Sequence, residues 1–437
     1  MHIETAQQSI RRTKRITDIV GMTACVLVSS LGAQAEQTEK PASGSTALTT
    51  AIPDGIPHSI VVEYQEDDAT EKLQAALDSG AATVRIPYVG KPWITRPLSI
   101  RSKTKLTLDP GVVLMAKKGA YKDVHDCVLS AERVQEIGIY GGPGARIQMH
   151  KDDYLDQSAY EKSEWRHCIR LRGVNRAYIH GLSLVSSGGD GLYVGPTWDD
   201  DRVPCSNIKA FEIDYIDNTR QGLTVVAATS SHFGASRVSL TGGRAPQAAI
   251  DIEPSSPSDP IDVELMDWHI STNEGSGLLI VLDRTDPDSR ISVKASQFYI
   301  SGTRQAAVRM KSAGARSAAG RVSLSNFVIE DISHEGLKLE NWNLGTNYDV
   351  VLDRIVMSDV GQDVPTPISF GFIGDSMGRG TLLIGDSVLY DQGAREKVNA
   401  SINGDMPAPL IGRLEVVTNA VPAASLPWAQ AFAINYR

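Results

Sequence analysis

The stretch that decides the fold is NRAYIHGLSLVSSGGDGLYVG, residues 175–195, which contains two short strands separated by turn residues. In each strand apolar residues alternate with polar ones, as expected when one face of a β-strand is buried. Five segments with the same plan follow, each with a Gly or Ala just before its second strand. Aligning these small residues gives steps of 31, 27, 28, 30 and 29 residues; they are Gly191, Gly222, Ala249, Gly277, Ala307 and Gly336.

A repeat of this length that is built from strands predicts a solenoid. No helical period competes with the strands, and a propeller blade would need a longer unit with four strands. A parallel β-helix fits best, because one rung cannot bury its apolar face alone and stacked rungs form a continuous core. A helix near residues 68–79 is expected to cap the N-terminal end of the stack, and residues 405–437 the C-terminal end.

The helix followed by this strand repeat resembles the opening of pectin-lyase-like right-handed parallel β-helix proteins, and the likeness covers roughly residues 60–400. The motifs EWRH (164–167), SGGDG (187–191), NTRQG (218–222) and DIEP (251–254) are similar to motifs of secreted bacterial β-helix proteins with carbohydrate roles. The resemblance implies an all-β fold, a single-stranded right-handed parallel β-helix with an N-terminal capping helix. It leaves the reaction open, because this superfamily includes polysaccharide lyases, glycoside hydrolases, uronate epimerases and phage tailspikes.

Residues 1–35 are typical of an export signal. The basic run RRTKR (11–15) precedes an apolar stretch that ends in an A-x-A pattern, which predicts cleavage after Ala35. Residues 36–54 are then expected to form a disordered leader, and residues 55–437 the β-helix domain. The mature protein would be secreted or periplasmic. A membrane anchor is disfavoured because the apolar run is short, and no later segment is long enough to span a bilayer.

Charge and cysteine content narrow the set of partners. Without the signal the chain has 39 Lys and Arg against 50 Asp and Glu, a net charge of about −11. Nucleic acid and anionic membranes are therefore not expected as partners, since phosphate neutralisation needs a basic surface. The three cysteines left after cleavage give no metal-binding spacing, although one disulfide between Cys127 and Cys168 is conceivable if Val128 pairs with Ile169.

The alignment also predicts which side chains stack on neighbouring rungs, about 4.8 Å apart. The expected inward column contains Ile169, Leu192, Leu223, Ile250, Leu278, Val308 and Leu337. The next residue of each strand faces outward, and these are Arg170, Tyr193, Thr224, Asp251, Leu279, Arg309 and Lys338. A slip of one residue would reverse every face.

Chemically reactive side chains are concentrated in the outward columns between residues 164 and 253. The candidate catalytic residues are Asp190, Asp251, Glu253 and His167. The candidate substrate-binding residues are Arg166, Arg170, Tyr193, Gln221, Arg220, Trp165 and Trp198. Each could instead be structural: Asp is common in turns, and an outward carboxylate pair is often only solvated. Their shared exterior face favours a glycan site, because aromatic rings suit stacking on sugar rings.

Glycoside hydrolysis is the favoured interpretation. An inverting hydrolase needs a protonated carboxylic acid for the leaving oxygen and a carboxylate that activates water. Asp251 and Glu253 lie about 7 Å apart along one strand, and Asp190 lies two rungs from Asp251, roughly 10 Å by rung spacing. Both separations are near the range of about 6.5–9.5 Å that inverting enzymes use. No cofactor is expected for this chemistry.

Two alternatives remain open at this stage. In a polysaccharide lyase or uronate epimerase, Arg170 and Arg166 would neutralise the sugar carboxylate, His167 would remove the C5 proton and Tyr193 would act as the acid. In that case Asp190, Asp251 and Glu253 could instead hold Ca²⁺. The other alternative is a glycan-binding or adhesin β-helix without catalysis. In every case the expected partner is a polysaccharide or oligosaccharide.

Overall fold

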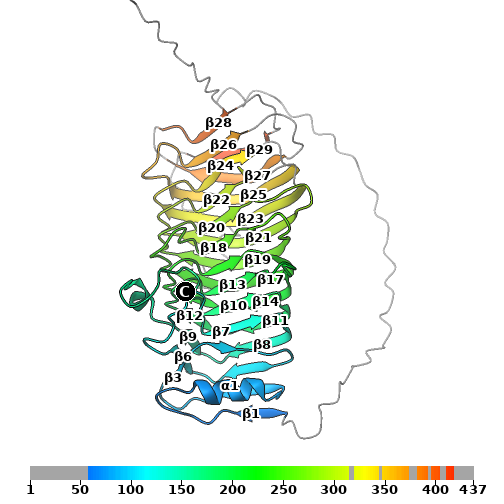
Figure 1. The fold of residues 1–437 in the computed structure, drawn as a ribbon. Helices are drawn as coiled ribbons and strands as arrows, with labels where there is room; N and C mark the ends of the chain where they lie inside the picture. The colour runs from blue at the N-terminus through cyan, green and yellow to red at the C-terminus, as the bar shows by residue number, and fades with distance from the viewer. Residues whose placement is uncertain are drawn as a thin grey trace, which may run out of the picture.

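The computed structural model describes residues 58–313, 319–343, 347–373, 381–391, 395–403 and 410–417. The predicted signal, the leader and most of the predicted C-terminal cap lie outside these residues. The described chain forms a parallel β-solenoid of about 9 turns, whose rungs pile up into one column (Figure 1). Helix α1 (Thr70–Asp78) and strand β1 (Ser59–Val61) lie at one end, and α1 buries Leu73, Ala76 and Leu77.

Two parallel sheets run along the column. Within the described ranges the smaller sheet has 11 strands. In stacking order they are β4 (Leu98–Ser99), β7 (Leu129–Glu132), β10 (Ile169–Arg172), β13 (Leu192–Gly195), β16 (Leu223–Val225), β18 (Ile250–Ile252), β20 (Leu278–Val281), β22 (Val308–Lys311), β24 (Leu337–Asn343), β26 (Ile368–Ile373) and β28 (Val398–Asn403). Its outer face carries the candidate site.

The larger sheet begins as two ladders. One consists of β1, β2 (Thr83–Ile86), β5 (Lys105–Leu108), β8 (Gln135–Gly141), β11 (Asn175–His180) and β14 (Cys205–Phe211). The other consists of β3 (Trp93–Thr95), β6 (Val113–Ala116), β9 (Arg146–Gln148), β12 (Ser183–Val185) and β15 (Asp214–Ile216). Both ladders pair with β17 (Ala228–Ser239) and continue as long strands, namely β19 (Ile261–Ser271), β21 (Arg290–Ser301), β23 (Ala319–Ile332), β25 (Asn347–Val360), β27 (Leu382–Tyr390) and β29 (Leu410–Val417).

The predicted register of the smaller sheet is confirmed. Ile169 pairs with Leu192, Leu192 with Leu223, and Leu223 with Ile250, and the pairing continues through Leu278, Val308 and Leu337. All seven side chains of this column are buried. A second inward column stacks Tyr215, Trp268, Phe298 and Phe327, with the last two rings 4.6 Å apart and nearly parallel. The core therefore runs unbroken along the axis, as the repeat predicts.

The register extended back to residue 127 was wrong by one residue. Leu129, not Val128, pairs with Ile169, so Cys127 is not the neighbour of Cys168. Cys127, Cys168 and Cys205 are all buried free thiols. The slip arose because the long segment before β10 has no repeat from which its length could be judged.

A residue with a left-handed backbone lies at the corner between β14 and β15 and, at the aligned position, within β17, β19, β21, β23 and β25. These residues align across rungs and are Glu212, Ala235, Asp267, Gln297, Asn326 and Arg354, with φ between 46° and 64°. A non-glycine residue in this conformation costs roughly 1–2 kcal/mol. The corner redirects the chain between two faces while the ladder continues on both sides of it.

Replacing Gln297 by glycine is expected to stabilise the protein by up to about 1 kcal/mol. Glycine removes the left-handed strain, and its extra chain entropy offsets part of the gain. Urea unfolding measures the difference. The matched control is Ser296→Gly, at an extended position of the same strand, which should destabilise by about 0.5–1 kcal/mol. Equal effects of the two changes would contradict the assignment of strain to the corner.

The described residues contain no helix that is long and apolar enough to cross a membrane.

Candidate active site

The candidate residues come from four successive rungs of the smaller sheet. Asp251 lies in the middle of β18 and pairs with Thr224 of β16, with its side chain on the outer face. His167, Asp190 and Gln221 each precede the first residue of their strand by two positions, in β10, β13 and β16. The stacking of these strands therefore brings together side chains separated by more than 80 residues in the chain.

His167 and Asp190 are in direct contact. The backbone N–H of Asp190 donates to His167 Nδ1 at 2.9 Å, and an Asp190 carboxylate oxygen lies 3.3 Å from the same nitrogen. Both side chains are fully buried. Burial and the nearby charges of Arg170 and Arg220 lower the pKa of His167 well below its usual value, so the ring is neutral. Since Nδ1 accepts a hydrogen bond, the single ring proton is on Nε2.

Arg220 is surrounded by carboxylates. Its guanidinium lies 3.6 Å from Glu164 and 3.8 Å from Glu253 and interacts electrostatically with Asp190 and Asp251. Although burial opposes it, the charges of these carboxylates raise the pKa of Arg220. We call Glu164, Asp190, Asp251 and Glu253 around Arg220 the carboxylate cluster. Asp190 and Asp251 are fully buried, and two buried carboxylates beside one guanidinium favour a proton on at least one of them.

Asp190 and Asp251 are the members that hold protons most strongly. Burial raises the pKa of Asp190 to about 7, and the Arg220 charge opposes the shift. Burial, followed by repulsion from Glu253, raises the pKa of Asp251 well above its usual value. Gln221 donates a hydrogen bond of 2.8 Å to one Asp251 oxygen. The other oxygen has no partner among the described residues and can carry the proton.

Several buried polar atoms of this cluster and its surroundings lack hydrogen-bond partners in the described part of the chain. They are His167 Nε2, Gln221 Oε1, Asp251 Oδ1, Arg220 Nε and Ser276 Oγ. A buried polar group without a partner costs free energy, and native proteins rarely contain many in one place. Such a concentration indicates a site for water or for the polar groups of a ligand.

An aromatic rim lies beside the cluster and consists of His125, Trp165 and Trp198. The His125 ring stacks on Trp165 at 5.0 Å and contacts Trp198 at 4.3 Å. Trp165 and Trp198 are 37% and 44% exposed, which is high for tryptophan. Arg172, which also pairs with Glu132, packs over the Trp198 ring at 3.8 Å, and Arg170 lies 5.4 Å from it. The rim is accessible to a ligand, unlike the fully buried carboxyls of Asp190 and Asp251.

Arg166 and Tyr193 differ from the other predicted binding residues in their surroundings. Arg166 is fully buried and donates to the backbone carbonyls of Tyr121, Lys122 and Glu161, so we omit it from the proposed site. Tyr193 stacks on His167 at 5.0 Å, and burial raises the pKa of its hydroxyl to about 12. It forms part of the lining over the buried imidazole.

Three residues of the site were not among the predicted ones. Glu164 stands in the quoted EWRH motif, but it precedes the repeat and no period assigns it a direction. Thr224 was placed in the outward column, yet a threonine there gave no signal of chemistry. His125 comes from the loop before β7 and could not have been placed from sequence.

The described residues contain no group of three or more His, Cys, Asp or Glu side chains arranged to hold a metal ion. The alternative in which Asp190, Asp251 and Glu253 bind Ca²⁺ therefore gains no support from the geometry.

Replacing Gly195 by alanine is expected to destabilise the protein by about 1–3 kcal/mol, the usual cost of overpacking. A Cβ at this position would lie 2.5 Å from the Tyr193 hydroxyl oxygen, so the Tyr193 ring would have to leave its place against His167. Urea unfolding gives the free-energy change. In a Tyr193→Ala background the same change should cost little, and an undiminished cost there would contradict the proposed clash.

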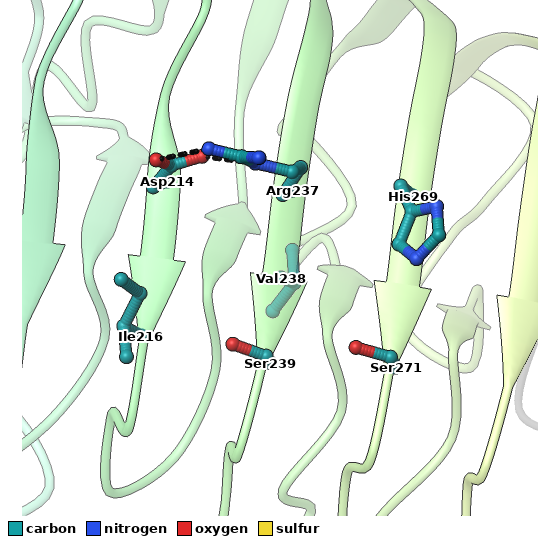
Figure 2. Close-up of a pocket in the computed structure, with 7 residues that line it drawn as sticks. All are labelled: Asp214, Ile216, Arg237, Val238, Ser239, His269 and Ser271. Atoms are coloured by element: carbon teal, nitrogen blue, oxygen red, sulfur yellow. Dashed lines mark hydrogen bonds and ion pairs between the residues drawn. The ribbon is translucent and has the colours of Figure 1, made fainter. Parts of the chain in front are cut away.

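Two pockets of the described chain lie on the larger sheet. One of about 300 Å³ opens on β15, β17 and β19 of the larger sheet, where Asp214, Arg237 and His269 line it (Figure 2). The Asp190 and Asp251 side chains have no solvent-exposed surface, so a ligand reaches these two carboxyls only after neighbouring side chains move.

No family model matches this chain, and no curated protein sequence is similar to it. Solved structures are similar to it in fold. An exopolygalacturonase from Thermotoga maritima is 11% identical with a TM-score of 0.57, and the match covers 84% of this chain and 93% of that one. An endo-xylogalacturonan hydrolase from Aspergillus tubingensis is 13% identical with a TM-score of 0.56, over 83% and 100%. The A-module of a mannuronan C-5 epimerase from Azotobacter vinelandii is 12% identical with a TM-score of 0.51, over 81% and 96%.

Proposed function

Since this chain has the fold of the pectin-lyase-like right-handed parallel β-helix superfamily, we propose that it is a secreted glycoside hydrolase that cleaves a polysaccharide at the carboxylate cluster. The observation that carries the proposal is the pair of fully buried carboxyls, Asp190 and Asp251, beside a single guanidinium. The fold alone would not choose a reaction, because unrelated functions share it.

The two carboxyls can divide the roles of acid and base. Asp251, beside Glu253, keeps its proton and would donate it to the leaving glycosidic oxygen. Asp190, with a pKa of about 7, ionises near neutrality and would remove a proton from the attacking water. Arg220 would stabilise the ionised base and, after proton transfer, the Asp251 carboxylate. Two buried carboxyls whose protonation states differ are the pattern expected of an acid and base pair.

Proton abstraction from a uronate fits this geometry less well. The neutral His167 carries its proton on Nε2, and Nδ1 already accepts from the backbone, so neither nitrogen can act as the base without rearrangement. Tyr193 has a pKa of about 12 and keeps its proton too tightly to be an efficient acid near neutral pH. Arg166 is engaged with three carbonyls, so only Arg170 remains to neutralise a sugar carboxylate.

The aromatic rim gives the proposed enzyme a surface for sugar rings. Trp165 and Trp198 are exposed, and aromatic faces suit stacking on sugar rings. A bound chain would press on Tyr193, which stacks on His167, and on Arg220, which interacts with the buried carboxyls. Their displacement would open the acid and base only when a substrate is present.

The test supplies the purified protein with neutral and uronate-containing polysaccharides and measures new reducing ends and the ultraviolet absorbance of unsaturated products. Hydrolysis gives reducing ends without the absorbance, whereas reducing ends accompanied by the absorbance would make the protein a lyase. The ratio kcat/KM should rise with pH around 7 as Asp190 ionises, and fall again where Asp251 loses the proton that burial and Glu253 help it to keep. If the protein cleaves neither kind of polysaccharide but is retarded in a gel that contains one, a non-catalytic glycan-binding protein is favoured instead.

A further inference from the structure

The pocket of Figure 2 lies on a different face of the solenoid from the carboxylate cluster. It has a volume of about 300 Å³ and lies beyond the left-handed corner of the long strands. Figure 2 shows Asp214, Arg237 and His269 projecting from three neighbouring strands, with Ser239 and Ser271 below them. Nothing in the proposed hydrolysis uses these residues.

Two outward columns of different character meet in this pocket. Arg237, His269 and Tyr299 pair across β17, β19 and β21, and the His269 ring stacks on Tyr299 at 4.7 Å. Two positions further along the same strands, Ser239 and Ser271 pair with each other, and Ser301 follows on the next rung. A row of flat groups therefore runs beside a row of hydroxyls.

The hydroxyls are available for a ligand. Neither Ser239 nor Ser271 uses its side-chain oxygen in a hydrogen bond with another described residue, and both are partly exposed. Asp214 and Arg237 form two parallel hydrogen bonds of 2.7 Å, and both side chains line the pocket beside the two serines.

The charge balance of the pocket selects the kind of ligand. Asp214 and Arg237 compensate each other, and burial lowers the pKa of His269, so the imidazole adds no charge near neutral pH. A strongly anionic or cationic ligand would find no unbalanced partner here. A sugar ring offers the matching surfaces, since its apolar face can lie on an imidazole or phenol ring and its hydroxyls can bond to serine, Asp and Arg side chains.

We propose that this face is a second, non-catalytic glycan-binding site that holds a neutral sugar chain along β17, β19 and β21. The flat column would contact the ring faces, and the serine column would bond to the hydroxyls. Rungs follow one another about every 4.8 Å along the axis. A sugar chain that runs across the rungs therefore meets one flat group and one serine on each rung. The site lies on another face than the carboxylate cluster and does not depend on whether that cluster is catalytic.

The test uses the full-length mature protein with Asp251→Asn, which suppresses turnover, in affinity gel electrophoresis. The gels contain xyloglucan, β-1,4-xylan or galactomannan as neutral probes. At least one polymer should retard the protein, and adding Arg237→Ala and His269→Ala should weaken the apparent affinity about tenfold or more. The matched control is Met266→Ala, an exposed position of the same strand on the other side of the corner, which should leave retardation unchanged. Thermal melts show whether each variant is folded.

Three outcomes would overturn the proposal. The first is the absence of retardation by every neutral polymer. The second is retardation that persists in folded Arg237→Ala, His269→Ala protein. The third is that Trp198→Ala abolishes retardation whereas the Arg237→Ala, His269→Ala protein is still retarded, because the glycan would then bind at the aromatic rim. Size-exclusion chromatography adds a check, because a change of oligomeric state in the pocket variant would mark the face as a contact between copies of the chain. Loss of hydrolysis in these variants is not the readout, so failure of the proposed enzyme activity would be seen separately.

Discussion

Replacing Asp251 by asparagine is expected to lower kcat for glycan hydrolysis by about 10²–10⁴-fold, the usual contribution of a positioned general acid. Asparagine has the same shape and can still accept the hydrogen bond from Gln221, so the fold of β18 should be preserved. Asp190→Asn should cause a loss of similar size because it removes the base. Initial rates on the polysaccharide identified by the reducing-end assay give the comparison.

Glu253→Gln is the matched control for this experiment. Glu253 lies on the same strand face as Asp251, but its side chain is 40% exposed, and it contacts Arg220 only at 3.8 Å. A loss of less than about tenfold is expected from it. If Asp251→Asn kept more than a tenth of the wild-type rate, the carboxylate cluster would not be the catalytic centre.

The second large effect is on stability, which is expected to fall over the pH range in which activity rises. The pKa of Asp190 is about 7 in the folded protein and near 3.8 when unfolded. Between pH 3.8 and about pH 7 the Asp190 carboxyl is protonated in the folded state and ionised in the unfolded state. The stability that Asp190 contributes is therefore highest at low pH and falls as pH rises. The loss is at most about 1.4 kcal/mol per pH unit, or of order 4 kcal/mol over the window. Asp190→Asn should remove this loss and unfold at higher urea concentration than wild type at pH 8.

Asp199→Asn provides the control for the stability measurement. Hydrogen bonds from Arg133 and Thr197 lower the pKa of this exposed carboxyl to about 2. The stabilisation that comes from this lowered pKa is fully present above the unfolded pKa of Asp199 and is lost only as pH falls toward 2. Asp199→Asn should therefore not change the slope of the unfolding free energy against pH between pH 5 and 8. Identical pH slopes for wild type and Asp190→Asn would show that Asp190 is not protonated in the folded protein.

The alternation of apolar and polar residues was enough to predict the rungs and the faces of the smaller sheet. Ile250 and Asp251 show why, since period two fixes opposite directions for neighbours and a shared step of about 29 residues fixes the stacking. The prediction failed where the repeat is interrupted, as at Cys127, because a long insertion removes the reference that sets the register.

The state of the site was harder to predict than its position. Sequence spacing places Asp190, His167 and Asp251 on one exterior face of the solenoid. The structure buries all three, with Tyr193 stacked on His167 and Arg220 interacting electrostatically with both aspartates. Loop side chains follow no period, so the covering groups, and the pKa shifts that burial causes, could not be derived from the pattern.

The row of left-handed corner residues has an evolutionary consequence. Its members are Glu, Ala, Asp, Gln, Asn and Arg, so the bend is a property of backbone position and not of one amino acid. The cross-section of the solenoid depends on these bends and on apolar columns whose side chains can be exchanged. It therefore tolerates nearly any sequence on the exterior. Chains can therefore share this outline while most of their residues differ, as this chain and the solved structures at 11–13% identity do.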